Sequence, residues 1–502
     1  MPSSLSRPMA MLAASIVGAS LAVHAWHAVS TAAYVDFVTG VWLALANDVA
    51  HGVFYRDLAG PDGYGGTRYF PLFFLSIGAL MRLGLGPLAA GFLVSVVAAV
   101  LLVAGIRRLL LRFGLPPAVA AAVAIFVLAP RFLQQGLLAI RSDILAAGLV
   151  VWGLDCAWSA FDEERPATKT LAAASLCFTL AVATKVTSVY APAGVTLALL
   201  WAARPGAALR LGSMVAAGIA AMVAVVAAAS SGRAVESWLS CGLAGAGIAE
   251  WLASVPAVFF SQILGPSRVF TSALLAAMAA WLAMARARGP KVLIVLFPVT
   301  LGATAVVLAS PGTSYTNQLA DALAIGLVVI GWVLARYPPV RPAAVFVLLL
   351  LSLAAARQSL MPVTDAALRQ RARQLSAERD GLVREMTAFG APVLSESPEV
   401  LALGGVRPYL LDPFTLRVLS VRRPDLLGPL YRDLDARRFA RVVLMYDPQS
   451  PAGRGWYTNV DFGWPILSRI LANYEFAGVR AGLRVYRPKA GPPAVAELKP
   501  LR

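Results

Sequence analysis

Long apolar runs occupy the first two thirds of the chain, and short polar segments, many of them basic, separate the runs. A helix needs roughly 20 predominantly apolar residues to cross the hydrocarbon core of a bilayer. The pattern predicts a polytopic α-helical membrane protein with about eleven transmembrane helices, several of them only 15–18 residues long. The predicted spans lie near residues 9–29, 87–106, 116–130, 143–160, 170–184, 186–203, 211–229, 269–285, 292–309, 318–335 and 342–359.

The segment 71–85, PLFFLSIGALMRLGL, decides which side of the membrane every later loop faces. If it does not span, the cytoplasmic loops hold Arg107, Arg108, Arg112, Arg165, Lys169, Arg204, Arg210, Arg286, Arg288, Lys291, Arg336 and Arg341. If it spans, these residues face outward, against the tendency of Lys and Arg to stay on the cytoplasmic side. We therefore predict that 71–85 is a helix in or near the outer interface and that the N-terminus is inside.

The first run has an alternative interpretation as a cleaved signal peptide, because AVHAWHA offers small residues near its end. Its length and the many spans that follow favour a retained first span. With that span kept, a large first loop (30–86) and everything after residue 360 lie on the outer face. The segments 131–142, 230–268 and 310–317 are predicted to be shorter outer loops.

The tail, residues 361–502, differs from the rest of the chain in composition. It has 21 Lys and Arg and 14 Asp and Glu, and no run in it is long enough to span a membrane. It opens with a predicted amphipathic helix, TDAALRQRARQLSAERDGLVREM, and short β-like runs follow at APVLS, RVVLMY and LRVYRP. We predict a transmembrane domain over residues 1–360 and a small extracytoplasmic α/β domain over 361–502.

The composition agrees with this interpretation and changes the meaning of the charge. The chain is 59% apolar and 14% charged, whereas a soluble domain is roughly 45–50% apolar and about 25% charged. A mean hydropathy of +0.72 excludes a soluble enzyme, a disordered protein and a disulfide scaffold. The net charge of +17 is mostly a topology signal from the cytoplasmic loops, so no nucleic-acid partner is predicted.

The few cysteines and histidines limit the possible chemistry. The cysteines are Cys156, Cys177 and Cys241, an odd number that gives no disulfide framework. The histidines are His24, His27 and His51, and there is no HExxH or CxxC motif. No metal site or other cofactor is therefore predicted, and the sequence gives no support for a divalent metal. Chemistry must rest on carboxylates, Arg, Lys and hydroxyl groups.

The first outer loop offers the best candidate for a catalytic group. Asp36 follows the first span by a few residues, at the start of a predicted helix. A carboxylate there can act as a general base for a hydroxyl that arrives from the aqueous side. The alternative is a simple helix cap or dipole partner. Asp48 is a weaker candidate, and Asp57 and Asp62 lie in a Gly- and Pro-rich segment where turn residues are common.

A second group of charged residues lies at the predicted outer ends of spans, where basic residues are not expected. The group contains Arg131, Arg141, Asp143 and Lys185. Lys185 can hold a lipid phosphate, or it can extend to the interface without a ligand. Asp143 can be a helix N-cap or a carboxylate of the site.

Other polar residues can line the same cavity. These candidates are Arg68, Tyr69, Tyr315 and Asn317. Asp321 lies one helical turn past Asn317 inside an apolar run, which favours a role in the cavity. Asp155 also lies in an apolar run, near the predicted inner end, and the sequence names no partner for it.

The order of these features resembles that of bacterial GT-C type integral-membrane glycosyltransferases. This group includes protein O-mannosyltransferases and transferases that add sugars to lipopolysaccharide. The matching features are Asp36, HGVFY ending at Tyr55, RYFPLFF with Pro71, Asp143 in IRSDILA and Lys185 in ATKVT, and the resemblance covers about residues 9–335. Family members often have Asp-Glu at the catalytic position, whereas Phe37 follows Asp36 here.

The resemblance implies an inverting transfer of a sugar from a polyprenyl-phosphate-linked donor to an acceptor hydroxyl at the outer face of the cytoplasmic (inner) membrane. It implies that Asp36 is the general base and that Lys185, with Arg131 or Arg141 second, binds the donor phosphate. The implied partners are this donor, an unidentified envelope acceptor and membrane lipid.

Two other functions stay open. A multi-span transporter or flippase for a lipid-linked glycan would share the spans and the outer basic residues. It would not require a large first loop with an aspartate beside the membrane, or an outer domain. A non-catalytic envelope scaffold would use the outer domain to bind a partner.

Overall fold

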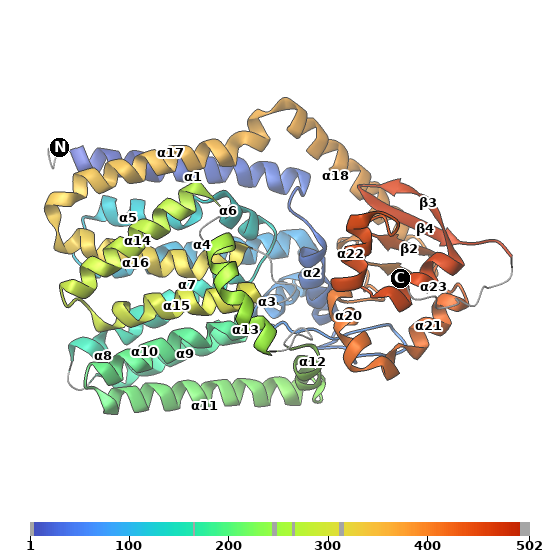
Figure 1. Cartoon of the computed structure of the whole chain (residues 1–502), viewed down its shortest axis with the longest axis horizontal. Coiled ribbons are helices and arrows are strands. Elements are labelled where there is room, and N and C mark those ends of the chain that lie inside the picture. Colours follow the sequence, from blue (N-terminus) through green and yellow to red (C-terminus); the bar gives the residue numbers. More distant parts are fainter. Residues whose placement is uncertain (1–4, 164–165, 243–247, 264–266, 311–315, 492–502) are drawn as a thin grey trace.

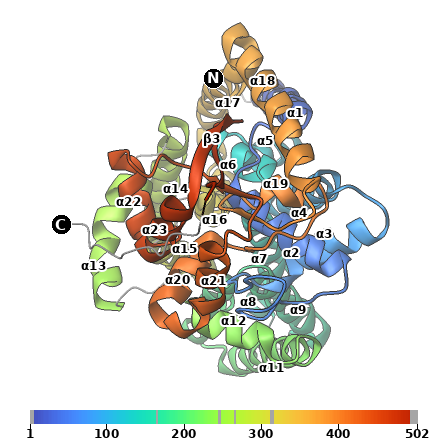
Figure 2. The same cartoon turned by 90° about the vertical axis from the view of Figure 1, so that its right-hand side faces the viewer.

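The structure is a computed structural model that describes residues 5–163, 166–242, 248–263, 267–310 and 316–491. Figure 1 shows two regions: a bundle of long helices and, at one end of it, a part built around a small sheet. Two short helices, α2 and α3, lie between the long helices and the sheet (Figure 1). Figure 2 shows the sheet-containing part in front of the end of the bundle.

The bundle comprises seventeen α-helices in the part of the chain that is described. They are α1 (Ser6–Thr31), α2 (Phe37–Ala50), α3 (Pro71–Arg82), α4 (Pro87–Arg112), α5 (Pro117–Ile125), α6 (Arg131–Leu138), α7 (Asp143–Ala157), α8 (Ser159–Asp162), α9 (Thr168–Thr184), α10 (Tyr190–Trp201), α11 (Pro205–Ala229), α12 (Arg233–Cys241), α13 (Ile248–Val258), α14 (Arg268–Arg286), α15 (Lys291–Ala309), α16 (Ala320–Arg336) and α17 (Arg341–Thr364). Short helical turns are η2 (Phe126–Leu128), η3 (Val186–Val189), η5 (Phe259–Ile263), η6 (Thr316–Leu319) and η7 (Pro338–Val340).

Among the described residues, eight helices are long and apolar enough to cross a membrane, or nine if one bent pair counts as a single span. The bent pair is Pro117–Leu128 and Arg131–Leu138, at 69° to each other. Two further predicted spans correspond to the shorter apolar helices Thr168–Thr184 and Val186–Trp201. The chain is therefore a polytopic helical membrane protein, and the count of eleven spans stays a prediction.

Proline and arginine mark the ends of several long helices. Pro87 opens α4 and Pro205 opens α11, where the missing proline N–H costs nothing because the first helical N–H groups have no partner. Arg112, Arg286 and Arg336 lie in the last turns of α4, α14 and α16. A cation there is stabilised by the partial negative charge of the helix C-terminus.

The structure corrects two of the predicted loops and bears out one predicted helix. The segment 131–142 contains α6, and 230–268 contains α12 and α13. These segments are too short or too polar to span, but apolar residues at helical spacing still allow them to form helices that pack on the bundle. The segment 71–85 contains the helix α3, as predicted.

The C-terminal part contains one mixed sheet with the strand order β1-β2-β4-β3. Its strands are β1 (Val393–Ser395), β2 (Arg441–Leu444), β3 (Tyr474–Arg480) and β4 (Leu483–Pro488). Its helices are α18 (Ala366–Thr387), α19 (Glu399–Ala402), α20 (Pro413–Arg422), η8 (Pro424–Leu427), α21 (Gly428–Asp435), α22 (Pro451–Asn459) and α23 (Trp464–Asn473). β1 and β2 are parallel, and the other two pairs are antiparallel.

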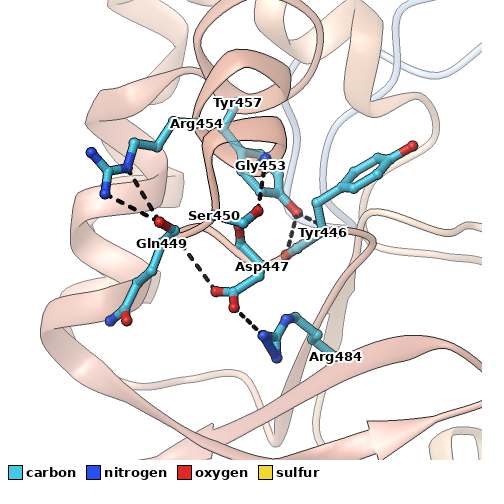
Figure 3. A network of polar contacts seen from close by, with 8 residues as sticks. All are labelled: Tyr446, Asp447, Gln449, Ser450, Gly453, Arg454, Tyr457 and Arg484. Atoms are coloured by element: carbon cyan, nitrogen blue, oxygen red, sulfur yellow. Dashed lines mark hydrogen bonds and ion pairs between the residues drawn. The ribbon is translucent and has the colours of Figure 1, made fainter.

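A polar network holds the start of α22 against the sheet (Figure 3). Asp447 follows β2 and pairs with Arg484 of β4. The Ser450 Oγ accepts a hydrogen bond of 3.0 Å from the backbone N–H of Gly453. A Cβ at Gly453 would lie 1.8 Å from the Asp447 carbonyl oxygen, so only glycine fits this turn. The network fixes the start of α22, the helix whose Trp456 ring lies 6.3 Å from the ring of Phe37 in α2.

The C-terminal part is joined tightly to the first outer loop. The backbone N–H of Tyr64 donates to the carbonyl of Tyr409 over 2.7 Å. The buried Asp48 carboxylate accepts two hydrogen bonds of 2.6 Å from Arg56 and one of 2.9 Å from Arg407. Arg56 lies in the loop itself and Arg407 in the C-terminal part, so the full set of hydrogen bonds to Asp48 forms only when both segments are in place. The loop and the C-terminal part therefore form one folded unit.

Candidate functional site

Asp36 is both the N-cap of α2 and one half of an ion pair. Its Oδ1 accepts a hydrogen bond of 2.9 Å from the backbone N–H of Thr39, which satisfies one of the free donors at the helix start. Its Oδ2 lies 2.6 Å from Nη2 of Arg141. The Asp36 side chain is 40% exposed while that of Arg141 is 5% exposed. The carboxylate is thus held at a fixed orientation and still open to a substrate.

The turn between α6 and α7 brings Arg141 to this carboxylate. Thr39 Oγ1 lies 2.8 Å from the Ala139 carbonyl oxygen and 3.0 Å from Asp36 Oδ1, so the start of α2 is fixed to this turn. Ile140, between Ala139 and Arg141, has a φ of 53°. This conformation is energetically unfavourable for a β-branched residue. Strain of this kind persists where the surrounding contacts impose it, and here they impose the direction of Arg141.

Lys185 lies in a cluster of buried charges from three helices. Its Nζ is 2.8 Å from Asp143 Oδ1 and 3.4 Å from Asp321 Oδ2. The side chains of Asp143 and Asp321 are 5% and 4% exposed. Asn317 donates from Nδ2 to the other oxygen of Asp143, whereas Tyr315 lies outside the described residues. With two carboxylates and one ammonium group, the cluster has a formal charge of −1.

A small polar cavity adjoins this cluster. It is lined by Lys185, Thr187, Tyr190, Ala303, Thr304, Val307, Gln318 and Asp321. Its volume is about 10 Å³, which is room for about one water molecule. The Gln318 Oε1 on its wall makes no hydrogen bond to any described residue. At this volume the cavity is too small for a ligand of more than a few atoms.

The two charge groups meet at the α6–α7 turn. Arg141 and Asp143 are separated by one residue, so their Cα atoms lie within about 7 Å of each other. The Asp36–Arg141 pair and the Lys185 cluster therefore lie next to each other at one end of α7. This arrangement unites six of the residues that the sequence singled out: Asp36, Arg141, Asp143, Lys185, Asn317 and Asp321.

The remaining predicted residues lie in the first outer loop and at the start of α6. The guanidinium of Arg68 is 4.5 Å from the ring centre of Phe414, in the C-terminal part. The ring of Tyr69 stacks on Trp42 of α2 at 4.2 Å, and burial raises the pKa of its hydroxyl to about 12. Arg131 opens α6, and its buried Nε makes no hydrogen bond to any described residue.

The weaker acidic candidates have other positions in the fold. Asp155 is 1% exposed and pairs with Arg108 at 2.6 Å and Arg112 at 3.1 Å, so it links α7 to α4. Asp62, 74% exposed, lies 3.7 Å from Arg407 in the joint with the C-terminal part. Asp57 is exposed in the same loop.

Glu399 is a neighbour of the site that the sequence did not indicate. The first turn of α19 packs so closely on α2 that a Cβ at Gly40 would lie 2.2 Å from the Glu399 backbone nitrogen and 2.8 Å from its Oε2. Gly40 is one helical turn past Asp36. Burial raises the pKa of the Glu399 carboxyl to about 7, and the negative charge of Asp36 adds to the effect. Nothing in the local sequence SESPEV separates this residue from a surface glutamate.

No group of three or more His, Cys, Asp and Glu side chains is arranged to hold a metal ion within the residues that the structure describes. The charged groups near Asp36 are instead paired acids and bases. The site can therefore accept a proton at Asp36 and stabilise an anion through Arg141.

Comparisons with known proteins give no match to a family model and no match to a curated protein. Solved structures do match. The archaeal oligosaccharyltransferase AglB from Archaeoglobus fulgidus, in complex with an inhibitory peptide and a dolichol-phosphate, has a TM-score of 0.55 at 12% identity, over 94% of this chain and 74% of that chain. ArnT from Cupriavidus metallidurans, bound to undecaprenyl phosphate, has a TM-score of 0.52 at 12% identity, over 95% of this chain and 97% of that chain.

Proposed function

Because the chain has the fold of the GT-C glycosyltransferases AglB and ArnT, we propose that it moves a sugar from a polyprenyl-phosphate-linked donor to an acceptor hydroxyl. The observation that carries the proposal is Asp36, a partly exposed carboxylate that a buried Arg141 holds beside the predicted membrane surface. The two solved structures were obtained with a dolichol-phosphate and an undecaprenyl phosphate, which supports a lipid phosphate as part of the donor.

Asp36 is the general base in this proposal. Its Oδ2 takes the proton of the acceptor hydroxyl as the acceptor oxygen forms a bond to C1 of the sugar. The bond between C1 and the phosphate oxygen breaks on the opposite side, so the configuration at C1 is inverted and the polyprenyl phosphate leaves. Thr39 and Arg141 already hold the carboxylate in place, and fixed orientation of a catalytic group lowers the barrier.

The leaving phosphate gains negative charge in the transition state, and a fixed cation beside it lowers the barrier. Arg131 is one candidate for this role, since its buried Nε makes no hydrogen bond to any described residue. Arg141 can contact the phosphate while it holds Asp36. Lys185 also stays in the proposed donor site, although its charge is shared with Asp143 and Asp321. A donor phosphate would meet it at the edge of the cluster.

The membrane topology is part of the proposal. The first outer loop and the C-terminal part pack together through Asp48 and Arg407, which requires both to be on the same side of the membrane. An odd number of spans between the N-terminus and residue 360 places both on the outer face of the cytoplasmic membrane, and eleven spans meet that requirement. The boundary between the transmembrane and extracytoplasmic domains falls near residue 360.

The test is transfer by purified protein in detergent, with a labelled polyprenyl-phosphate sugar and a crude envelope acceptor fraction. Replacing Asp36 by Asn should lower the rate by about 10²- to 10⁴-fold, the contribution typical of a general base. Asp57→Asn, the same change at an exposed position of the same loop, is the control and should keep full activity.

Full activity of Asp36→Asn would reject Asp36 as the base. Arg141→Lys keeps the charge but not the planar geometry of the contact to Asp36, and it should lower activity less than Asp36→Asn does. Transfer in detergent, where no membrane separates two compartments, also distinguishes a transferase from a flippase for a lipid-linked glycan.

A further inference from the structure

A groove of about 350 Å³ lies apart from the site described above. The C-terminal end of α2, the helix α3 and the last turn of α11 surround it. It is lined by Val49, Gly52, Val53, Phe54, Leu75, Arg82, Val225, Val226 and Ala229. Its volume falls within the roughly 300–1,000 Å³ of small-molecule pockets.

The groove has one apolar and one cationic end. Among these described lining residues Arg82 alone is charged, and the others are apolar side chains or glycine. The Nε of Arg82 is 3.4 Å from the carbonyl oxygen of Ala50, at the C-terminal end of α2, and Arg82 is an exposed residue. The groove therefore matches a ligand with an apolar chain and an anionic head.

The position of the groove indicates where such a ligand comes from. α11 is among the candidate membrane spans, with only 17% of its apolar window buried in the protein. Val225, in its last turns, is 67% exposed, and Leu83 beside Arg82 is 78% exposed. Large apolar side chains exposed around a groove at the end of a span face lipid rather than water. The cation lies at the end of α3, where the chain leaves the apolar surface.

The groove is also separate from the proposed transfer site. Asp36 caps the N-terminus of α2, and Val49 lies near its C-terminus. At 1.5 Å per residue the two ends of this helix are about 20 Å apart. A phosphate at Arg82 is therefore too far from Asp36 to be the leaving group of the transfer reaction.

We propose that this groove is a binding site for an anionic phospholipid of the surrounding leaflet, with one acyl chain along Val53, Leu75 and Val225 and the phosphate at Arg82. The inference does not depend on the transferase function. The lipid would hold α11 against α2 and α3 of the first outer loop.

The experiment is a lipid titration of the delipidated full-length protein in detergent, followed by native mass spectrometry. The probes are a phosphatidylglycerol, a phosphatidylcholine with the same chains, and glycerol 1-phosphate. Wild-type protein should bind phosphatidylglycerol most tightly. Arg82→Gln should weaken that binding about tenfold, the effect of losing one charge-assisted hydrogen bond. Arg210→Gln, at the other end of α11, removes the same charge and should bind as wild type does.

A second variant keeps the proposal falsifiable if Arg82 affects folding. Ala229→Trp fills the groove from an exposed position and should prevent lipid binding without removing a charge. Three results would overturn the proposal: unchanged phosphatidylglycerol binding by both variants, equal binding of phosphatidylcholine, or equal binding of glycerol 1-phosphate. The second would show that no anionic head is recognised, and the third that no apolar chain is.

Discussion

Glu399 is a buried carboxyl group beside Asp36, and its replacement by glutamine perturbs the charge at the joint between the C-terminal part and α2. The shape of the side chain is nearly unchanged, so the close contact with Gly40 can persist. What changes is the ionisation: glutamine is neutral at every pH. The free energy of unfolding of the variant should therefore differ from that of the wild type in a way that depends on pH.

The magnitude follows from the raised pKa. The carboxyl has an ordinary pKa of 4.5 and a pKa of about 7 in the folded protein, chiefly because it is buried. Below pH 4.5 the carboxyl is protonated in both the folded and the unfolded protein, so it does not change the free energy of unfolding. Between pH 4.5 and 7 only the unfolded chain ionises, so stability falls as the pH rises. Above pH 7 the loss of stability is complete. It amounts to about 1.4 kcal/mol for each unit of difference between the folded and unfolded pKa values, or about 3 kcal/mol in total.

The measurement is chemical denaturation of the purified protein in detergent at pH 5, 6, 7 and 8, followed by tryptophan fluorescence. Relative to wild type, Glu399→Gln should gain up to about 3 kcal/mol across this range and then level off. Glu236→Gln, the same change at an exposed position of α12, should show no such trend. A difference between Glu399→Gln and wild type that is constant with pH would refute the reasoning, and so would one that falls as the pH rises.

Two further predictions concern packing and charge. Lys185→Met leaves Asp143 and Asp321 as uncompensated buried carboxylates and should lower the free energy of unfolding by about 3–5 kcal/mol. Adding Asp321→Asn should recover part of that loss. Equal stability of Lys185→Met and wild type would contradict the compensation of the two carboxylates by Lys185. Gly40→Ala places a Cβ 2.2 Å from a backbone nitrogen of α19 and should speed amide hydrogen exchange there. Gly455→Ala, where a Cβ meets no atom within 4 Å, should leave the exchange of α19 unchanged.

Much of the fold follows from local patterns in the sequence. Long apolar runs identify the membrane helices, and the runs APVLS, RVVLMY and LRVYRP contain β1, β2 and β4. The strand β3 was missed because its alternation is broken. The register shifts between Phe476 and Gly478, so the apolar and polar positions do not alternate through the strand.

The sequence identifies only those site residues that lie near the end of a predicted span or the start of a predicted helix. Asp36 follows a span and starts a helix, so its position is visible in the sequence. Its partner Arg141 was a candidate, but the pairing was not, because 105 residues separate them. Glu399 gave no local signal at all. Its burial depends on the approach of α19 to Gly40, and contact between distant segments leaves no periodic pattern in either one.

The joint between the first outer loop and the C-terminal part also sets an order of events during biosynthesis. Asp48 and Arg407 are 359 residues apart, so at roughly 5–20 residues per second the ribosome needs roughly 20–70 s to add the second partner after the first. Throughout this interval the loop lacks the segment that covers it. The joint at Asp48 is therefore completed only after the helices of the bundle have been synthesised. A chain that ends before Arg407 would leave the Asp48 carboxylate without one of its two arginine partners.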